Sequence, residues 1–121
     1  EEFMKSKLKI IEEDRKNAKH GDFFFAKYAV SNSKKPVRES PVFIISNDND
    51  IEDVIVCNCT KQPPRSDFDV LVNLKLPTHV RTNKIYSIYR NQLLFKIPQK
   101  ANPEEYKYII EKLKKAIKLD S

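Results

Sequence analysis

The stretch PVFIISNDNDIEDVIVCNCTKQPPR, residues 41–65, contains two apolar runs that lead into a small group of polar and cationic residues. The runs PVFIIS and VIVCNCT are rich in β-branched and aromatic residues, as strands are. The residues between them, NDNDIED, favour a turn. The sequence therefore predicts a hairpin-like pair of strands. Thr60, Lys61 and Arg65 follow the second run, so a hydroxyl and two cations are expected at one edge of the sheet.

Other strand-like segments lie on both sides of this pair. FFFAKYAV precedes it, and DFDVLVNL, KIYSIY and QLLFKI follow it. Their apolar and aromatic residues suit strands, and several of them alternate with polar neighbours. We expect SNSKKPVRES, residues 31–40, and LPTHV, residues 76–80, to be connections. Five or six short strands with frequent turns predict a mainly β fold, either a small barrel or a strongly curved sheet.

Both ends of the chain carry helical signals. Near the C-terminus, Asn102, Pro103 and Glu105 form a capping pattern, and apolar residues then recur at helical spacing, which predicts a helix over 103–118. Residues 1–20 are expected to be an arm or a short helix, with residues 1–3, ahead of Met4, typical of a tag remnant. Residues 21–121 are expected to form one domain, since the length suits a single core.

Composition excludes several classes of protein. There are 23 Lys and Arg residues against 17 Asp and Glu residues, a net charge of +6, which favours phosphate-rich partners. No apolar run approaches the roughly 20 residues that span a bilayer, and no signal peptide is apparent, so we expect a cytoplasmic protein without membrane contact. Cys57 and Cys59 could bind zinc only together with His20 and His79 from distant segments, so they are expected to be buried thiols rather than zinc ligands.

Motif searches narrow the chemistry further. Gly21 is the only glycine, so a Walker or dinucleotide-binding loop is excluded. The sequence contains neither G-x-S-x-G nor H-E-x-x-H, which argues against serine hydrolysis and zinc proteolysis. We therefore expect no metal and no cofactor.

Cations and a hydroxyl flank the two paired runs at the same predicted edge. Lys34, Lys35 and Arg38 precede the first run, and Thr60 ends the second. Cleavage of RNA without metal needs a base, an acid and donors that stabilise charge on the phosphate, and guanidinium groups suit the last role. The same residues also fit a simpler interpretation, in which they are solvated loop charges.

The ordered segments GDFFFAKY, PVFIISND, VIVCNCT, LPTHV and NKIYSIYRNQL, followed by a helix, resemble the PemK/MazF group of bacterial toxins. The resemblance spans residues 21–119. It implies an SH3-like barrel, also shared by topoisomerase-poisoning toxins of the CcdB type. It further implies a cytoplasmic homodimer that cleaves single-stranded RNA without metal and is neutralised by an antitoxin protein.

The resemblance assigns roles to individual residues. Thr60 stands at the place of the family's active-site threonine, while Ser40 occupies the place where the family has an arginine. We expect Arg38 to take over that role as a second catalytic residue. Lys34 or Lys35 would substitute less well, because a lysine lacks the bidentate fork of arginine.

Further residues are expected along the RNA path, and some have a structural alternative. Tyr86 and Tyr89 stand where some members carry arginine and aspartate, and both would either stack on bases or pack inside the barrel. The RNA-binding residues predicted from the resemblance and the charges are Lys34, Lys35, Lys61, Arg65, His79, Tyr86 and Arg90. The alternative functions are an inactive barrel that binds protein or nucleic acid, and a topoisomerase-poisoning toxin.

Overall fold

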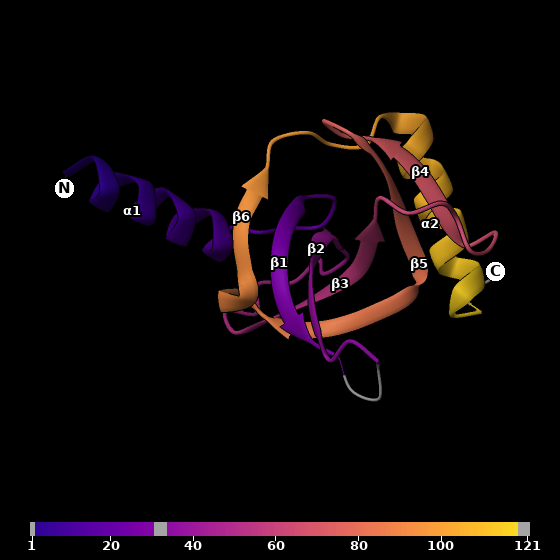
Figure 1. The fold of residues 1–121 in the computed structure, drawn as a ribbon, viewed down its shortest axis with the longest axis horizontal. Helices are drawn as coiled ribbons and strands as arrows, with labels where there is room; N and C mark the ends of the chain where they lie inside the picture. The colour runs from indigo at the N-terminus through magenta and orange to yellow at the C-terminus, as the bar shows by residue number, and fades with distance from the viewer. Residues whose placement is uncertain (1, 31–33, 119–121) are drawn as a thin grey trace.

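The computed structural model describes residues 2–30 and 34–118. Its elements in chain order are α1 (Glu2–Lys16), β1 (Phe23–Ala29), β2 (Val37–Ile44), β3 (Asp53–Thr60), β4 (Asp69–Asn73), β5 (Pro77–Tyr89), the 3-10 helix η1 (Arg90–Gln92), β6 (Leu93–Ile97) and α2 (Pro103–Ala116). The six strands form one antiparallel sheet in the order β4-β5-β3-β2-β1-β6. Figure 1 shows this sheet curled into a small barrel, with α2 beside β4 and β5 and α1 projecting from the side of β6. The predicted mainly β fold with a C-terminal helix is confirmed.

The predicted pairing of the two central runs is also confirmed, because β2 pairs antiparallel with β3. Two segments expected as connections belong to strands instead. β2 begins at Val37, because it pairs with the whole of β1, from Phe23 opposite Phe43 to Ala29 opposite Val37. β5 begins at Pro77, because its first residues pair with β4. A proline is tolerated at the first residue of a strand, where its missing N–H is least costly.

Two clusters of buried side chains hold the fold together. One contains Phe24, Val42 and Val56 from β1, β2 and β3. The other joins the opposite face of these strands to α2, whose Ile109 and Leu113 are buried there. The central strands are therefore covered on both faces. This burial explains why their sequences are continuously apolar rather than alternating.

Local signals fix the ends of several elements. Asn102 Oδ1 accepts the Glu105 N–H at 2.8 Å and the Asn102 N–H donates to Glu105 Oε1 at 2.9 Å, as the capping pattern predicts. Gly21 has a φ of +93°, a left-handed conformation that favours glycine, at the turn before β1. Among the described residues, no helix combines the length and the apolar character needed to cross a bilayer.

Candidate functional site

One face of β2 and β3 changes from apolar to polar along its length. On β2 this face passes from the buried Val42 to Ser40 and Arg38, because residues two apart on a strand share a face. On β3 it passes from Asn58, which lies opposite Val42, to Thr60. Within the described chain, the pairing of the two strands ends at Val42 and Asn58. The polar ends of β2 and β3 therefore line a hollow.

A hydrogen-bonded network forms the floor of this hollow. Tyr28 Oη and Ser40 Oγ both donate to Asn58 Oδ1, at 2.7 Å and 2.8 Å, and lie 3.2 Å from each other. Burial raises the pKa of Tyr28 to about 12, so its hydroxyl remains a donor at neutral pH. The Asn58 side-chain amide nitrogen has no acceptor among the described residues. Its N–H groups can therefore donate to a bound molecule.

Thr60 has a free donor as well. Its Oγ1 accepts the backbone N–H of Gln62 at 3.0 Å, which fixes the hydroxyl at the end of β3. A hydroxyl has one proton to donate in addition to its two lone pairs. Thr60 can thus donate a hydrogen bond into the hollow that it lines.

A bulge in β5 brings three further polar side chains to the hollow. Cys57 on β3 pairs with Ile85 on β5, whereas Cys59 pairs with Val80. Asn58, between the two cysteines, is therefore opposite residues 81–84 of β5. The buried Thr82 fixes this bulge, because its Oγ1 donates to the carbonyl of Phe68 at 2.7 Å. Bulges commonly redirect side chains in this way. The other bulge residues line the hollow: Arg81, Asn83 and Lys84.

Arg81 is paired with a buried carboxylate. It lies directly opposite Asp69 on β4, with 3.6 Å between Arg81 Nε and Asp69 Oδ1, and the two side chains are 11% and 1% exposed. Asp69 Oδ2 accepts the backbone N–H of Arg65 at 2.9 Å. A buried charge requires a counter-charge, so Asp69 stabilises the Arg81 guanidinium in the wall of the hollow.

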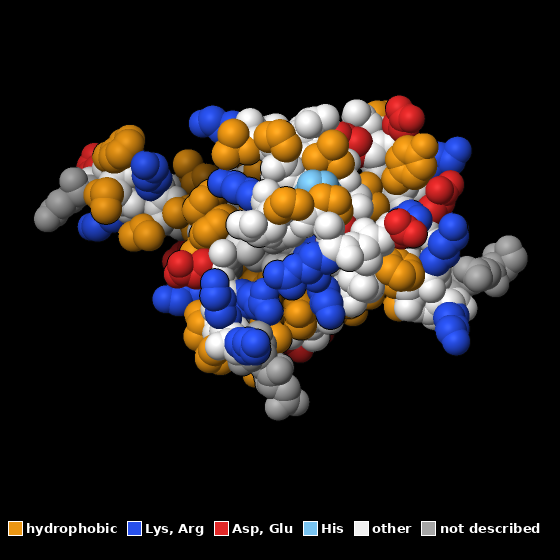
Figure 2. Space-filling model, turned by 45° about the vertical axis from the view of Figure 1, so that its right-hand side comes forward, with side chains coloured by type: hydrophobic (Ala, Val, Ile, Leu, Met, Phe, Trp, Pro, Cys, Tyr) orange, Lys and Arg blue, Asp and Glu red, His pale blue; other side chains and the backbone are white. Residues whose placement is uncertain are grey.

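The hollow is a strongly cationic cavity of about 1290 Å³. Among the residues that the structure describes, seven cationic side chains line it, against the single carboxylate of Glu39: Lys27, Lys34, Lys35, Arg38, Arg65, Arg81 and Lys84. This local excess of six positive charges equals the net charge of the whole chain. Figure 2 shows Lys and Arg side chains gathered across the middle of one face. The volume exceeds the roughly 300–1,000 Å³ of typical small-molecule sites, which favours an extended anionic ligand.

Six of the nine residues predicted for the site line this one cavity. They are Arg38, Thr60, Lys34, Lys35, Arg65 and Tyr86. They come from β2, β3, β5 and the loops that flank β2 and β3, so the fold gathers residues that are far apart in the sequence. Tyr86 is the aromatic residue of the lining, and its ring lies 5.7 Å from that of Tyr28.

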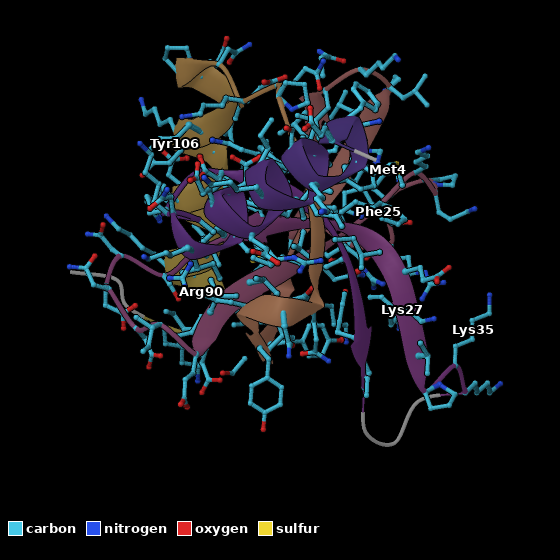
Figure 3. The ribbon with its side chains drawn as sticks, turned by 90° about the vertical axis from the view of Figure 1, so that its left-hand side faces the viewer. Met4, Phe25, Lys27, Lys35, Arg90 and Tyr106 are labelled. Atoms are coloured by element: carbon cyan, nitrogen blue, oxygen red, sulfur yellow. The ribbon has the colours of Figure 1, made fainter. Side chains whose placement is uncertain are left out.

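The other three predicted residues lie elsewhere. Lys61 is exposed next to Thr60 but outside the cavity lining, and His79 is partly buried opposite Thr60 on β5. Arg90 is 6% exposed, and its guanidinium donates to the carbonyls of Asp50, Arg15 and Ala18 at 2.7 to 3.0 Å. Figure 3 shows Arg90 beneath α1, well away from Lys27 and Lys35. The structure therefore gives Arg90 a structural role in place of the predicted RNA contact.

The sequence analysis missed several lining residues. Asn58, Asn83, Arg81 and Lys84 were not singled out, and neither was Lys27 on β1. A signal was present for the bulge residues, because the polar run RTNK interrupts an otherwise alternating strand at 81–84. Lys27 carried no such signal, since a single lysine on a strand usually faces solvent.

The described residues provide neither a metal-binding cluster nor a reactive thiol at the cavity. Across residues 2–30 and 34–118, no cluster of three or more His, Cys, Asp or Glu side chains is arranged to hold a metal ion. Cys57 and Cys59 are free and buried. Burial raises the pKa of the Cys57 thiol to about 12, and that of Cys59 well above its ordinary value, so both stay protonated.

Comparison with known proteins identifies the fold. No protein-family model and no curated protein sequence matches this chain. Solved structures do match. MazF from Deinococcus radiodurans superposes with a TM-score of 0.71 at 13% identity, covering 84% of this chain and 96% of its own. A mycobacterial endoribonuclease in complex with its cognate antitoxin gives 0.68 at 16% identity, covering 86% and 98%. Toxin MazF-mt6 of Mycobacterium tuberculosis gives 0.65 at 17% identity, covering 83% and 99%. The chain therefore has the fold of the PemK/MazF toxins.

Proposed function

We propose that this protein is a toxin-type endoribonuclease that cleaves single-stranded RNA without a metal ion. The observation that carries this proposal is the cavity in which the Thr60 hydroxyl lies with the guanidinium groups of Arg38 and Arg81. Its charge and size suit a length of RNA backbone. The endoribonucleases among the structural neighbours support the same activity at the level of the fold.

The chemistry follows from the groups in the lining. In metal-independent cleavage the RNA 2′-oxygen bonds to phosphorus while the bond to the 5′-oxygen breaks. This leaves a cyclic phosphate and, once the 5′-oxygen has taken a proton from solvent water, a 5′-hydroxyl. Negative charge grows on the non-bridging phosphate oxygens, and Arg38 and Arg81 supply guanidinium donors for it. Thr60 donates a hydrogen bond to the same phosphate. Arg81 thus supplies a guanidinium although Ser40 replaces the arginine that the family carries.

A proton acceptor for the 2′-hydroxyl is also present. Glu39 is the one carboxylate among the described lining residues, and the other ionisable side chains there are those of Lys, Arg, Tyr and Cys. Its Oε1 lies 3.6 Å from Lys27 Nζ at the exposed edge of the cavity. On β2, Glu39 lies on the strand face opposite to that of Arg38 and Ser40, and within the proposed mechanism it serves as the general base from the rim of the cavity.

Specific binding in this proposal comes from neutral groups beside the charges. The Tyr86 ring provides a surface on which one base can stack, which is worth about 1 to 3 kcal/mol. Asn58 can donate its amide N–H groups to base edges, and Asn83 can both donate and accept. Lys34, Lys35 and Arg65 supply the phosphate contacts around the edge of the cavity.

The partners in this proposal follow the family resemblance. The protein acts in the cytoplasm as a homodimer, and a small antitoxin neutralises it by covering the cavity. An acidic antitoxin segment suits the seven cations of the lining. One of the structural neighbours was solved with its cognate antitoxin.

Incubation of a long single-stranded RNA with the purified protein in EDTA, followed by primer extension, tests the activity. We expect discrete cuts with wild type, and a loss of about 10² to 10³-fold in Arg38→Ala, Arg81→Ala and Glu39→Gln. Thr60→Ala should slow cleavage in the same direction, and Thr60→Ser should restore it. Lys61→Ala is the matched control, because Lys61 adjoins Thr60 outside the lining.

Two outcomes would overturn the proposal. Uncut RNA that still binds in a gel shift would support the alternative of an inactive nucleic-acid-binding barrel. Cleavage that persists at full rate in all the cavity variants would place the nuclease activity elsewhere or in a contaminant.

A further inference from the structure

α1 exposes nearly all of its apolar side chains. Met4, Leu8 and Ile10 are 57% to 61% exposed, and α1 contains no buried residue. Met4, Leu8 and Ile11 follow one another at spacings of four and three, so they lie on one stripe of the helix. Figure 1 shows α1 projecting away from the barrel. Across the described residues, the stripe is therefore an apolar surface that the barrel leaves largely uncovered, with only Ile11 partly buried.

The last turn of α1 is firmly attached. The Arg15 side chain donates to the carbonyl of Leu93 on β6, and Arg90 donates to the Arg15 carbonyl at 2.9 Å. Only the first three turns of the helix project, so the direction of the apolar stripe is fixed relative to the barrel.

The interior of α1 carries two blocks of opposite charge. Lys5, Lys7 and Lys9 come first, and Glu12, Glu13 and Asp14 follow. The ends of the helix suit its dipole, with Glu2 in the first turn and Arg15 and Lys16 in the last. Lys9 precedes Glu13 at i,i+4, the less favourable order for an ion pair. Among the described residues, no ion pair involves a charged group of α1. A lone helix of 15 residues with this pattern is marginal in water.

We propose that α1 forms an antiparallel pair with α1 of a second copy of this chain. Reversal of a helix in which a block of three lysines precedes a block of three acids brings these blocks opposite each other, and each dipole then meets its opposite. With Leu8 level with Ile11 of the second copy, Lys5 comes near Glu12 on one flank of the pair and Lys7 near Asp14 on the other. The same contacts repeat on the other side of the two-fold axis, as an isologous interface requires.

The barrel extends this interface. In the same register, Met4 of the second copy comes level with Arg15, where α1 joins β6. Phe95 on β6 is 49% exposed there and stacks on Phe25 of β1, with ring centroids 5.4 Å apart. Figure 3 shows Met4 and Phe25 on the same side of the molecule. The first turn of the second copy's helix thus packs against this aromatic pair.

The composition of α1 favours this occupant over an anionic surface. Five cations and four anions nearly cancel along Glu2–Lys16, so the helix has little attraction for RNA or for acidic lipids. The cations of the protein gather instead at the cavity on another part of the surface. The pair joins the outside of two barrels and needs no contribution from the RNA site.

A charge swap tests the pair. One variant carries Lys5→Glu with Lys7→Glu, and the other carries Glu12→Lys with Asp14→Lys. Each variant alone brings like charges together, and we expect its self-association in sedimentation velocity to weaken by about tenfold or more at low salt. An equimolar mixture brings opposite charges together at both ends and should regain wild-type association. A mixture that stays as weak as the separate variants would overturn the proposal.

Cross-linking provides a second readout that association through the barrel does not affect. A mixture of Leu8→Cys and Ile11→Cys proteins should form an intermolecular disulfide faster under mild oxidation than either protein alone. The native Cys57 and Cys59 are at most 1% exposed and do not compete. Equal rates in the mixture and in the separate proteins would exclude the register. If Leu8 matters for association only when an antitoxin is present, then α1 binds the antitoxin and not a second copy of this chain. That result would overturn the proposal.

Discussion

Asp69 and Arg81 face each other across β4 and β5, with 3.6 Å between the carboxylate Oδ1 and the guanidinium Nε. The pair is almost entirely buried, yet Arg81 lines the cationic cavity. Arg81 Nε and Asp69 Oδ1 are both buried, and neither has a hydrogen-bond partner in the described part of the chain, so their contact is electrostatic. The carboxylate thus stabilises the charge of Arg81 in the wall of the cavity.

The first prediction concerns this pair. Arg81→Ala should lower cleavage by about 10² to 10³-fold, and Arg81→Lys should recover only part of it, because lysine lacks the planar fork. Asp69→Asn should lower cleavage less, since it leaves Arg81 in place but removes its counter-charge. Single-turnover cleavage rates at saturating protein measure both effects.

A double variant separates positioning from direct action. If Asp69 acts through Arg81, then Asp69→Asn should cost little more activity once Arg81 is alanine. Additive losses would contradict this coupling. Thermal unfolding of each variant is needed as a control, because removal of one member of a buried ion pair can cost about 3 to 5 kcal/mol of stability.

The second prediction uses two lysines. Lys84 lines the cavity and Lys61 lies outside it, although both are exposed. Lys84→Ala should weaken binding of single-stranded RNA and reduce the slope of log K against log salt concentration by about 0.7. Lys61→Ala should leave the slope unchanged. Filter binding at four salt concentrations, with a non-cleavable RNA, gives both slopes. Equal slopes for the two variants would show that the cavity does not contact phosphates.

The sequence predicts the elements that local chemistry determines. The capping box of Asn102 and Glu105 and the turn between β2 and β3 were recognisable because each depends on residues a few positions apart. The convergence of Arg38 and Thr60 on one cavity also follows from strand pairing, since both lie where the paired strands end.

Other features depend on contacts between distant segments. The bulge of β5 lies between two stretches of β5 that both pair with β3, and the first of these stretches also pairs with β4. A single sequence does not reveal these pairings between distant strands. Arg90 follows a strand as a loop cation would, and only the folded chain brings the carbonyls of Arg15, Ala18 and Asp50 to its guanidinium. The position of Arg81 beside Asp69 was hidden for the same reason.

The third prediction follows from the burial of Arg90. Arg90→Met should lower the free energy of unfolding by about 2 to 4 kcal/mol, because three carbonyls lose charge-assisted donors. The RNA affinity of the folded fraction should stay at the wild-type value. Arg65→Ala is the reverse case, since Arg65 is exposed and lines the cavity: its stability should hold and its RNA affinity should fall. Urea unfolding measures the stability of both variants, and filter binding measures their RNA affinity. A loss of RNA affinity in folded Arg90→Met would mean that Arg90 contacts RNA after all.

The fourth prediction concerns alkaline stability. Burial raises the pKa of Tyr28 to about 12 in the folded protein, against about 10 in the unfolded chain. The folded state therefore binds the phenolic proton more tightly, and this contribution is fully present below pH 10 and is lost as the pH rises towards 12. A shift of this size corresponds to about 2 to 3 kcal/mol.

Tyr28→Phe isolates this contribution from those of other groups. At pH 7 the variant should be about 1 kcal/mol less stable than wild type, because the hydrogen bond to Asn58 is lost. Between pH 10 and 11.5 wild type should lose stability faster than the variant, so the difference narrows. Because the pKa values of the buried Cys57 and Cys59 thiols are also raised, both proteins lose folding stability as the pH rises. Both thiols are present in wild type and in the variant, so their contribution cancels in the comparison. Urea unfolding at pH 7, 10 and 11.5 measures the difference, and parallel curves would mean that Tyr28 ionises in the folded state as easily as in the unfolded chain.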